Sequence, residues 1–268
     1  MRSFRLILIL QLLILTSFNF GQSNNSQPFN LDFTREAIIL GAGATAGITS
    51  LLIINNVEPL TPEQISLLNP ADVNGLDRGA IGPYKKDNVG DALVYTSFLL
   101  PATFLLNEQM NKDFLNLTLM YGEVLLLAES VNALVKVTVK RTRPFVYDSE
   151  TAVSDKTIKD ARFSFFSNHT TTAAAISFFT AKVFSEYLED NTAKVLIWCG
   201  AAIYPAVTAF MRVNTHWHFP TDVMVGYVFG ALVGYFIPEL HKNSSNDNIS
   251  LHTSYDFKRP LLNIQIKF

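Results

Sequence analysis

Long uncharged apolar runs alternate with shorter polar segments along this chain of 268 residues. Several runs approach the length of about 18 apolar residues that is typical of a membrane-spanning helix. Alternating strand and helix periodicity is absent, so the pattern predicts an all-α body, a bundle of about six core helices. The apolar stretches cover residues 37–54, 92–106, 195–211 and 223–238, and residues 124–128 lie within a longer helical pattern.

The regions outside this body have patterns of their own. Arg2 and Arg5 precede the apolar run LILILQLLIL, which is typical of a signal peptide or an N-terminal anchor. A polar insertion follows the first helix and contains LTPEQI, in which Thr61 and Pro62 predict the start of a short helix. The alternation in LNIQIKF favours a short strand. The predicted division is 1–21 signal or anchor, 22–35 polar leader, 36–240 helical domain, and 241–268 polar tail with the strand.

Three glycines recur every fourth residue in the last apolar run, at Gly226, Gly230 and Gly234. This spacing places them on one face of a helix, where a neighbouring backbone can approach closely. We therefore expect this helix to be packed tightly against another.

The composition of the chain also indicates contact with a membrane. Apolar residues make up 49% of the chain and charged residues 16%, with a mean hydropathy of +0.21. Soluble domains carry roughly 25% charged residues. The net charge of −2 gives no electrostatic reason to expect a nucleic-acid partner.

Three clusters of ionisable residues interrupt the apolar body, each at an expected helix end. Burying a charged group costs free energy, so charges in such places indicate a function. The first is VKVTVKRTRPF, in which Lys136 and Arg143 are seven residues apart with Lys140 between them. Two helical turns would place them on one face, ready to surround an anion. Taken alone, the same pattern also fits a basic helix end that faces lipid headgroups.

The second cluster is FFSNHTTTAAA, where Ser167 and Asn168 mark the start of a helix. Backbone N–H groups at a helix N-terminus favour an anion, and His169 lies beside them. Taken alone, His169 also fits a surface residue at a helix end.

The third cluster, MRVNTHWHFPTDV, contains Arg212, His216, His218 and Asp222. Four residues separate His218 from Asp222, so the carboxylate can accept a hydrogen bond from that imidazole, whereas His216 is the worse partner. Asp222 alone is also explained as an acidic residue at a helix start.

Together the three motifs resemble the type 2 phosphatidic acid phosphatase (PAP2) superfamily, which includes bacterial acid phosphatases and vanadium haloperoxidases. The pattern K-x6-RP is followed by FSNH in place of P-S-G-H, and then by R-x5-H-x3-D. The chain departs from the motifs at Phe166, Asn168, Met211 and His216, the last two in place of a serine and a glycine. These departures bear on substrate choice and rate more than on the type of reaction.

The resemblance implies a role for each motif residue. His218 would attack phosphorus to give a phosphohistidine, Asp222 would orient it, and His169 would serve as general acid and then base. Phosphate would be bound by Lys136, Arg143, Ser167, Asn168 and Arg212, while Lys140 and His216 would line the pocket. Three fixed cations would neutralise the phosphoryl charge, so neither a metal nor another cofactor is expected.

We therefore expect a phosphatase that acts on a phosphomonoester or diphosphate, in particular a lipid phosphate, in a bacterial envelope membrane with its site facing the periplasm. An outward-facing site would require that one early helix does not span the membrane. Residues 92–106 are the weakest candidate for a spanning helix. The alternatives are a soluble periplasmic acid phosphatase, a haloperoxidase with vanadate in the same cage, and a catalytically silent membrane protein. The specific lipid and the oligomeric state are not encoded in these motifs.

Overall fold

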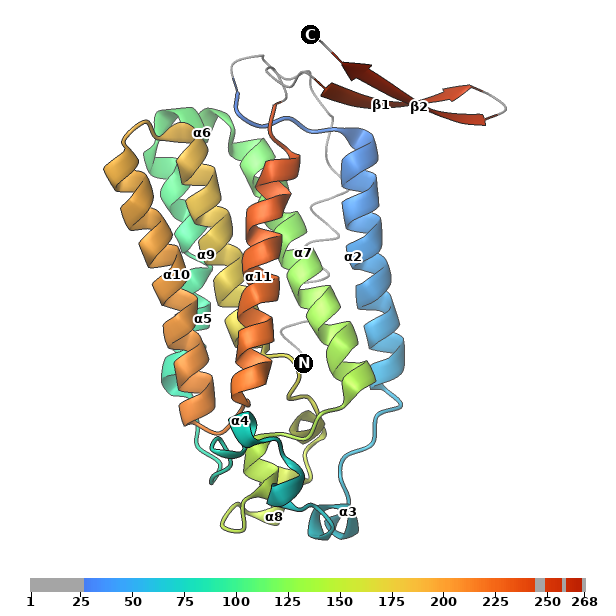
Figure 1. Cartoon of the computed structure of the whole chain (residues 1–268), viewed down its shortest axis with the longest axis vertical. Helices are drawn as coiled ribbons and strands as arrows, with labels where there is room; N and C mark the ends of the chain where they lie inside the picture. Colours follow the sequence, from blue (N-terminus) through green and yellow to red (C-terminus); the bar gives the residue numbers. More distant parts are fainter. Residues whose placement is uncertain (1–26, 244–248, 257–258, 267–268) are drawn as a thin grey trace.

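The computed structural model describes residues 27–243, 249–256 and 259–266, and within them the body is a helical bundle (Figure 1). The expected all-α class is confirmed. The segment predicted as a signal peptide or anchor lies outside the described residues. Six segments form the bundle: α2 (Phe33–Ile54), α5 (Asn88–Ser97) continued by the 3-10 helix η2 (Leu100–Leu106), α7 (Phe114–Val139), α9 (Asn168–Tyr187), α10 (Asn191–Asn214) and α11 (Pro220–Leu240).

Helix α9 is the core of the bundle, because α11, α10, α7 and α5 all pack against it. The glycine stripe of α11 makes the tightest of these contacts. A Cβ atom added to Gly230 or Gly234 would lie 2.3 Å or 2.2 Å from a carbonyl oxygen of α9. Gly226 approaches the carbonyl oxygen of Ser167 in the same way. The predicted tight packing is therefore present, and its partner is the backbone of α9.

The outer faces of the bundle are apolar. In the part of the chain that the structure describes, five segments are long and apolar enough to cross a membrane, namely residues 33–54, 88–106, 114–147, 191–214 and 220–240. Large apolar side chains such as Leu52, Phe210 and Val228 are exposed on them. Exposed apolar belts of this kind need a lipid environment, so the chain is a membrane protein.

Short elements cover one end of the bundle, at the bottom of Figure 1. The first three come from the predicted polar insertion: α3 (Pro62–Ser66), η1 (Pro70–Asp72) and α4 (Gly75–Arg78). Thr61 caps α3 as expected, because its hydroxyl accepts a hydrogen bond from the backbone N–H of Gln64. The loop between α7 and α9 contributes η3 (Pro144–Tyr147), α8 (Val153–Lys156) and η4 (Lys159–Arg162).

The opposite end carries the chain termini of the described region. Helix α6 (Glu108–Lys112) leads into α7 there, and an isolated bridge pairs Phe29 with Lys242. Beyond it, β1 (Ile249–Asp256) and β2 (Arg259–Ile266) form an antiparallel two-stranded sheet. The second strand includes most of the LNIQIKF segment, for which the alternation predicts a strand.

Candidate active site

A cavity of about 540 Å³ opens at the covered end of the bundle, where α7 ends and α9 begins. The three ionisable clusters meet here, although they are far apart in sequence. Lys136, His169 and His218 all line this cavity, as do Arg143 and Arg212. Four carboxylates share it: Asp87, Asp91, Glu129 and Asp160.

Lys136 and Arg143 reach the cavity by different routes, so the expectation of a single shared helix face is wrong. Helix α7 ends at Val139, and Lys140 terminates it in the left-handed conformation, with φ of 52°. Lys136 lies in the last helical turn, and its ammonium group donates to the carbonyl oxygen of Phe163 at 2.6 Å. Arg143 instead follows the helix in an extended segment.

The guanidinium group of Arg143 is fixed on three sides. It donates to the Asp160 side chain and backbone, each at 2.9 Å, and through Nη1 to the carbonyl oxygen of Trp217, also at 2.9 Å. The same Nη1 lies 3.0 Å from Nε2 of His218. A guanidinium can only donate, so Nε2 must accept, and the proton of a neutral His218 is then on Nδ1. Nε2 is the ring nitrogen with a lone pair facing the cations.

His218 is 1% exposed, and this burial is the first reason that its pKa lies well below the ordinary histidine value. The neighbouring cations Arg143, Lys136 and Arg212 lower the pKa further. The imidazole is therefore neutral at neutral pH, which is the form that can attack an electrophile.

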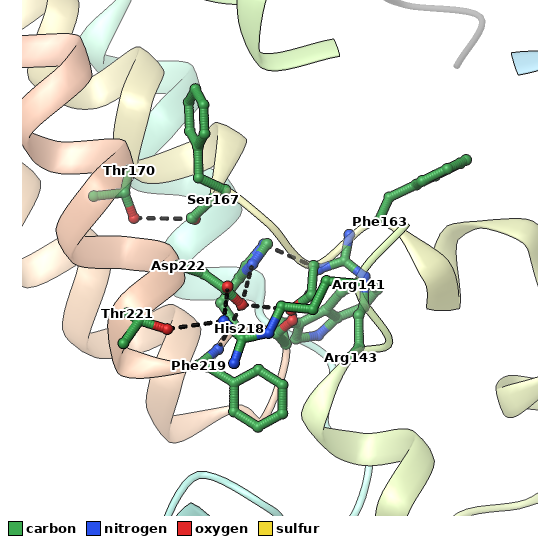
Figure 2. A network of polar contacts seen from close by, with 12 residues as sticks. Arg141, Arg143, Phe163, Ser167, Thr170, His218, Phe219, Thr221 and Asp222 are labelled. Carbon is green, nitrogen blue, oxygen red and sulfur yellow. Dashed lines mark hydrogen bonds and ion pairs between the residues drawn. The ribbon is translucent and has the colours of Figure 1, made fainter. Parts of the chain in front are cut away.

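Asp222 faces His218 but is held mainly by other groups (Figure 2). Its Oδ2 is 3.7 Å from Nδ1 of His218, too long for a hydrogen bond. The carboxylate accepts instead from Arg141 and the Ser164 hydroxyl, each at 2.5 Å, and from the backbone N–H of Phe219 at 2.9 Å. The last contact is the helix-start role that Asp222 also has at the beginning of α11.

Arg141 and Asp77 were missed by sequence reasoning, which considered Lys140 instead. Arg141 links Asp222 to Asp77 of α4, whose Oδ2 lies 2.7 Å from Nη2. Asp77 also accepts from the backbone N–H and the hydroxyl of Thr221. Burial alone would raise the pKa of Asp77, but the bonds from Arg141 and Thr221 outweigh it and lower this pKa. An arginine two residues before Arg143 was the only signal in the sequence.

His169 lies in the first turn of α9, and its Nε2 is 2.8 Å from Oδ1 of Asp91. Burial and the charge of Arg212 lower the pKa of His169, whereas the contact with Asp91 opposes that shift. Arg212 is paired with Asp87 at 2.9 Å, and its guanidinium carbon lies 4.8 Å from the centre of the Trp217 ring. Arg143 lies 4.9 Å from the same ring, so one indole positions both arginines.

Ser167 and Asn168 differ in their relation to the cavity. Asn168 lines it and donates from its side-chain amide to Glu129 at 3.1 Å. Ser167 is fully buried behind it, with its backbone N–H bound to the carbonyl oxygen of Asp222 at 3.1 Å. No side chain of the described residues caps the start of α9. The first-turn N–H groups beyond Ser167 therefore remain available to an anion.

Lys140 and His216 do not line the cavity, contrary to expectation. Lys140 is exposed beyond the end of α7. His216 has φ of 63°, the left-handed conformation that glycine adopts easily, and this explains why its motif position is normally a glycine. Its side chain points elsewhere, with Nδ1 2.9 Å from the carbonyl oxygen of Ala80.

Comparisons with known proteins agree with the motifs. Residues 117–245 match the model of the PAP2 superfamily. No curated protein matches the chain. One solved structure, described as the first transmembrane PAP2 type phosphatidylglycerolphosphate phosphatase from Bacillus subtilis, has 16% sequence identity and a TM-score of 0.43. The match covers 90% of this chain and 96% of that one. The family match supports the resemblance that the three motifs indicate.

Proposed function

Since residues 117–245 match the model of the PAP2 superfamily, we propose that this chain hydrolyses a phosphomonoester or diphosphate of a lipid through a phosphohistidine, without a catalytic metal. One observation carries the proposal. The lone pair on Nε2 of His218 faces a cavity in which Lys136, Arg143 and Arg212 supply three positive charges. A phosphoryl group with its negative oxygens among these cations would present phosphorus to that lone pair.

In the first step, Nε2 of His218 forms a bond to phosphorus as the bond from phosphorus to the leaving oxygen breaks. Arg143 must turn its Nη1 from Nε2 to a phosphoryl oxygen for this attack, and the two groups are already 3.0 Å apart. Protonated His169 donates its proton to the leaving oxygen. His218 then carries the phosphoryl group with both ring nitrogens engaged, and Asp222 stabilises the Nδ1 proton and its positive charge.

In the second step, neutral His169 accepts a proton from water as the water oxygen bonds to phosphorus. The bond from phosphorus to Nε2 breaks, which returns the electron pair to His218 and releases inorganic phosphate. Asp91 holds His169 in place for both transfers through the contact of 2.8 Å. Asp222 is a positioning residue in this scheme and touches no reacting atom.

The walls of the cavity support a lipid substrate. Leu51 and Ile54 of α2 line one side, and Ala133 and Val137 of α7 line it as well. These helices also present apolar faces to the membrane. An acyl or prenyl chain could therefore lie between α2 and α7 while its phosphate reaches the cations. A soluble acid phosphatase acts on water-soluble substrates, so an apolar cavity wall that faces the membrane would not contribute to its activity.

We place the cavity on the periplasmic side, as an extension of the same proposal. Residues 88–106 are among the candidate spans, so α2, α5 with η2, and α7 would all cross. The cavity is then on the side where α2 ends, and a periplasmic site requires α2 to begin at the cytoplasmic face. A cysteine introduced at Thr157, which follows α8 at the covered end of the bundle, in a Cys199→Ser background, tests this. Labelling by an impermeant thiol reagent in intact cells is expected, and labelling only after lysis would place the site in the cytoplasm.

The activity is tested with purified protein in EDTA on lipid phosphates, a prenyl diphosphate and a soluble aryl phosphate. Wild type should release phosphate from at least one lipid, and His218→Ala should not. In the His169→Ala variant, slow water attack should let a phosphoprotein accumulate that is labile to acid and stable to base. Turnover by His218→Ala, or an acid-stable phosphoprotein, would exclude this mechanism. Peroxide-dependent bromide oxidation with added vanadate would instead favour the haloperoxidase chemistry.

A further inference from the structure

A second buried cluster of ionisable side chains lies at the other end of the bundle, away from the cavity. Glu36 belongs to the first turn of α2, Glu123 to the first half of α7, and His241 follows the last residue of α11. These helix ends lie at the top of Figure 1, whereas the cavity is at the covered bottom end. The three side chains are 1%, 0% and 0% exposed. Phosphoryl transfer at the cavity makes no use of them.

The orientation of His241 leaves one ring nitrogen facing the two carboxylates. Its Nδ1 is 2.7 Å from the carbonyl oxygen of Ile237, and a carbonyl only accepts, so Nδ1 carries a proton. Nε2 lies 3.1 Å from Oε2 of Glu123 and 3.3 Å from Oε1 of Glu36. Metal-binding histidines are typically oriented in this way, with one nitrogen bonded to a carbonyl and the other free to bind the metal.

These close approaches are not satisfied hydrogen bonds. Nε2 of His241 and both carboxylate oxygens of Glu123 have no hydrogen-bond partner among the described residues, although all three atoms are buried. A buried carboxylate without donors is unstable unless a cation compensates it. Arg35 compensates Glu36, to which it donates from Nε and Nη2 at 3.1 Å and 2.9 Å. Among the described residues, the one ion-pair contact of Glu123 is with His241, at 3.1 Å.

We infer that Glu36, Glu123 and His241 bind a divalent cation of the zinc class, which joins α2, α7 and α11. Two ligands that are each about 2.0 to 2.2 Å from a tetrahedral metal lie about 3.3 to 3.6 Å apart. The separations of 3.1 Å and 3.3 Å need only small adjustments to reach that range. One imidazole nitrogen and two carboxylate oxygens are also a donor set that zinc accepts.

The surroundings indicate a structural rather than a catalytic role for this metal. The backbone N–H of Asn30 bonds to the carbonyl oxygen of His241, and Arg35 donates to that of Leu240 at 2.8 Å. The segment before α2 is thus joined to the end of α11. A metal at Glu123 adds α7 to this connection and fixes three helices at the end of the bundle farthest from the cavity.

Instead of a metal, a second proton could bind Nε2 of His241. The cluster would then be a buried ion pair between a charged histidine and the glutamates. Metal analysis of protein purified in detergent without chelators separates the two. We expect one equivalent of a divalent metal per chain in wild type. The metal content of Glu123→Gln should be lower by about tenfold or more, because this variant removes the charge of one ligand while keeping its shape. Glu186→Gln is the matched control, because Glu186 is an ion-paired carboxylate on α9 that does not touch the cluster. It should keep its metal.

A titration covers the case in which Glu123→Gln fails to fold. Chelator-stripped wild-type protein is titrated with cobalt(II), whose visible absorption reports coordination geometry. Saturation at one equivalent, with displacement by zinc and a higher melting temperature, supports the site. Metal-free wild type together with a flat cobalt titration would overturn it, as would equal metal content in Glu123→Gln and wild type.

Discussion

Replacing Arg141 by lysine tests whether Asp222 positions the nucleophile. Arg141 donates to Asp222 at 2.5 Å and to Asp77 at 2.7 Å, and both carboxylates are fully buried. Lysine keeps the charge but has a single ammonium group, so it should keep one of these bonds and lose the other. A hydrogen bond to a charged group contributes about 1.5–3 kcal/mol. Loss of that amount from the transition state alone would lower kcat by about 10- to 100-fold.

The assay is steady-state phosphate release by wild type and Arg141→Lys, with the melting temperature measured in parallel. Arg141 touches no substrate in the proposed mechanism, so kcat should fall while KM stays nearly constant. Arg162→Lys is the matched control, because Arg162 is also at the covered end but, among the described residues, donates only to the backbone of Glu58, at 3.3 Å. If Arg141→Lys lowers the melting temperature and leaves kcat unchanged, Arg141 is structural and the reasoning about Asp222 is refuted.

Three further predictions follow from the described contacts. The pKa of His218 is lowered, so its neutral, attacking form persists until the pH falls well below the ordinary histidine value near 6.5. The pKa of His169 is also lowered, so its protonated form is already lost at a pH below 6.5 as the pH rises. The bell-shaped kcat/KM profile should therefore peak on the acid side of pH 6.5, and a peak above pH 7 would contradict this assignment. Gly234→Ala should destabilise the protein by about 1–3 kcal/mol in denaturation, because the new Cβ meets a carbonyl of α9, whereas Gly200→Ala meets nothing within 4 Å and should not. His216→Gly should keep wild-type kcat and KM, since this side chain lies outside the cavity, and a fall in kcat of about tenfold would show that it acts on the reaction.

Periodicity and helix-start residues were enough to predict the bundle and its tight helix pair. The spacing of Gly226, Gly230 and Gly234 is a local property of one helix, and so it could be recognised without the partner. The same holds for Thr61 at the start of α3 and for His218 and Asp222, which are one turn apart.

Contacts between distant segments could not be predicted in this way. Asp77 reaches Arg141 across 64 residues, and nothing in its own short helix indicates a role beside Asp222. Lys140 was assigned to the pocket because the pattern continued the helix, whereas the left-handed turn at Lys140 ends it. His216 was assigned for its bulk, but the left-handed backbone at that position turns the side chain away from the cavity.

The contact between Arg143 and Nε2 of His218 has a consequence for substrate discrimination. In the proposed mechanism, the electron pair on Nε2 that would attack phosphorus is bonded to Arg143, so an incoming phosphate would have to compete for the same guanidinium before a bond to phosphorus could form. A dianionic monoester or a terminal diphosphate competes strongly, whereas a singly charged diester, such as the headgroup linkage of an ordinary phospholipid, competes weakly. Bulk membrane lipids would therefore be spared before the chemical step, at the stage where the nucleophile is released.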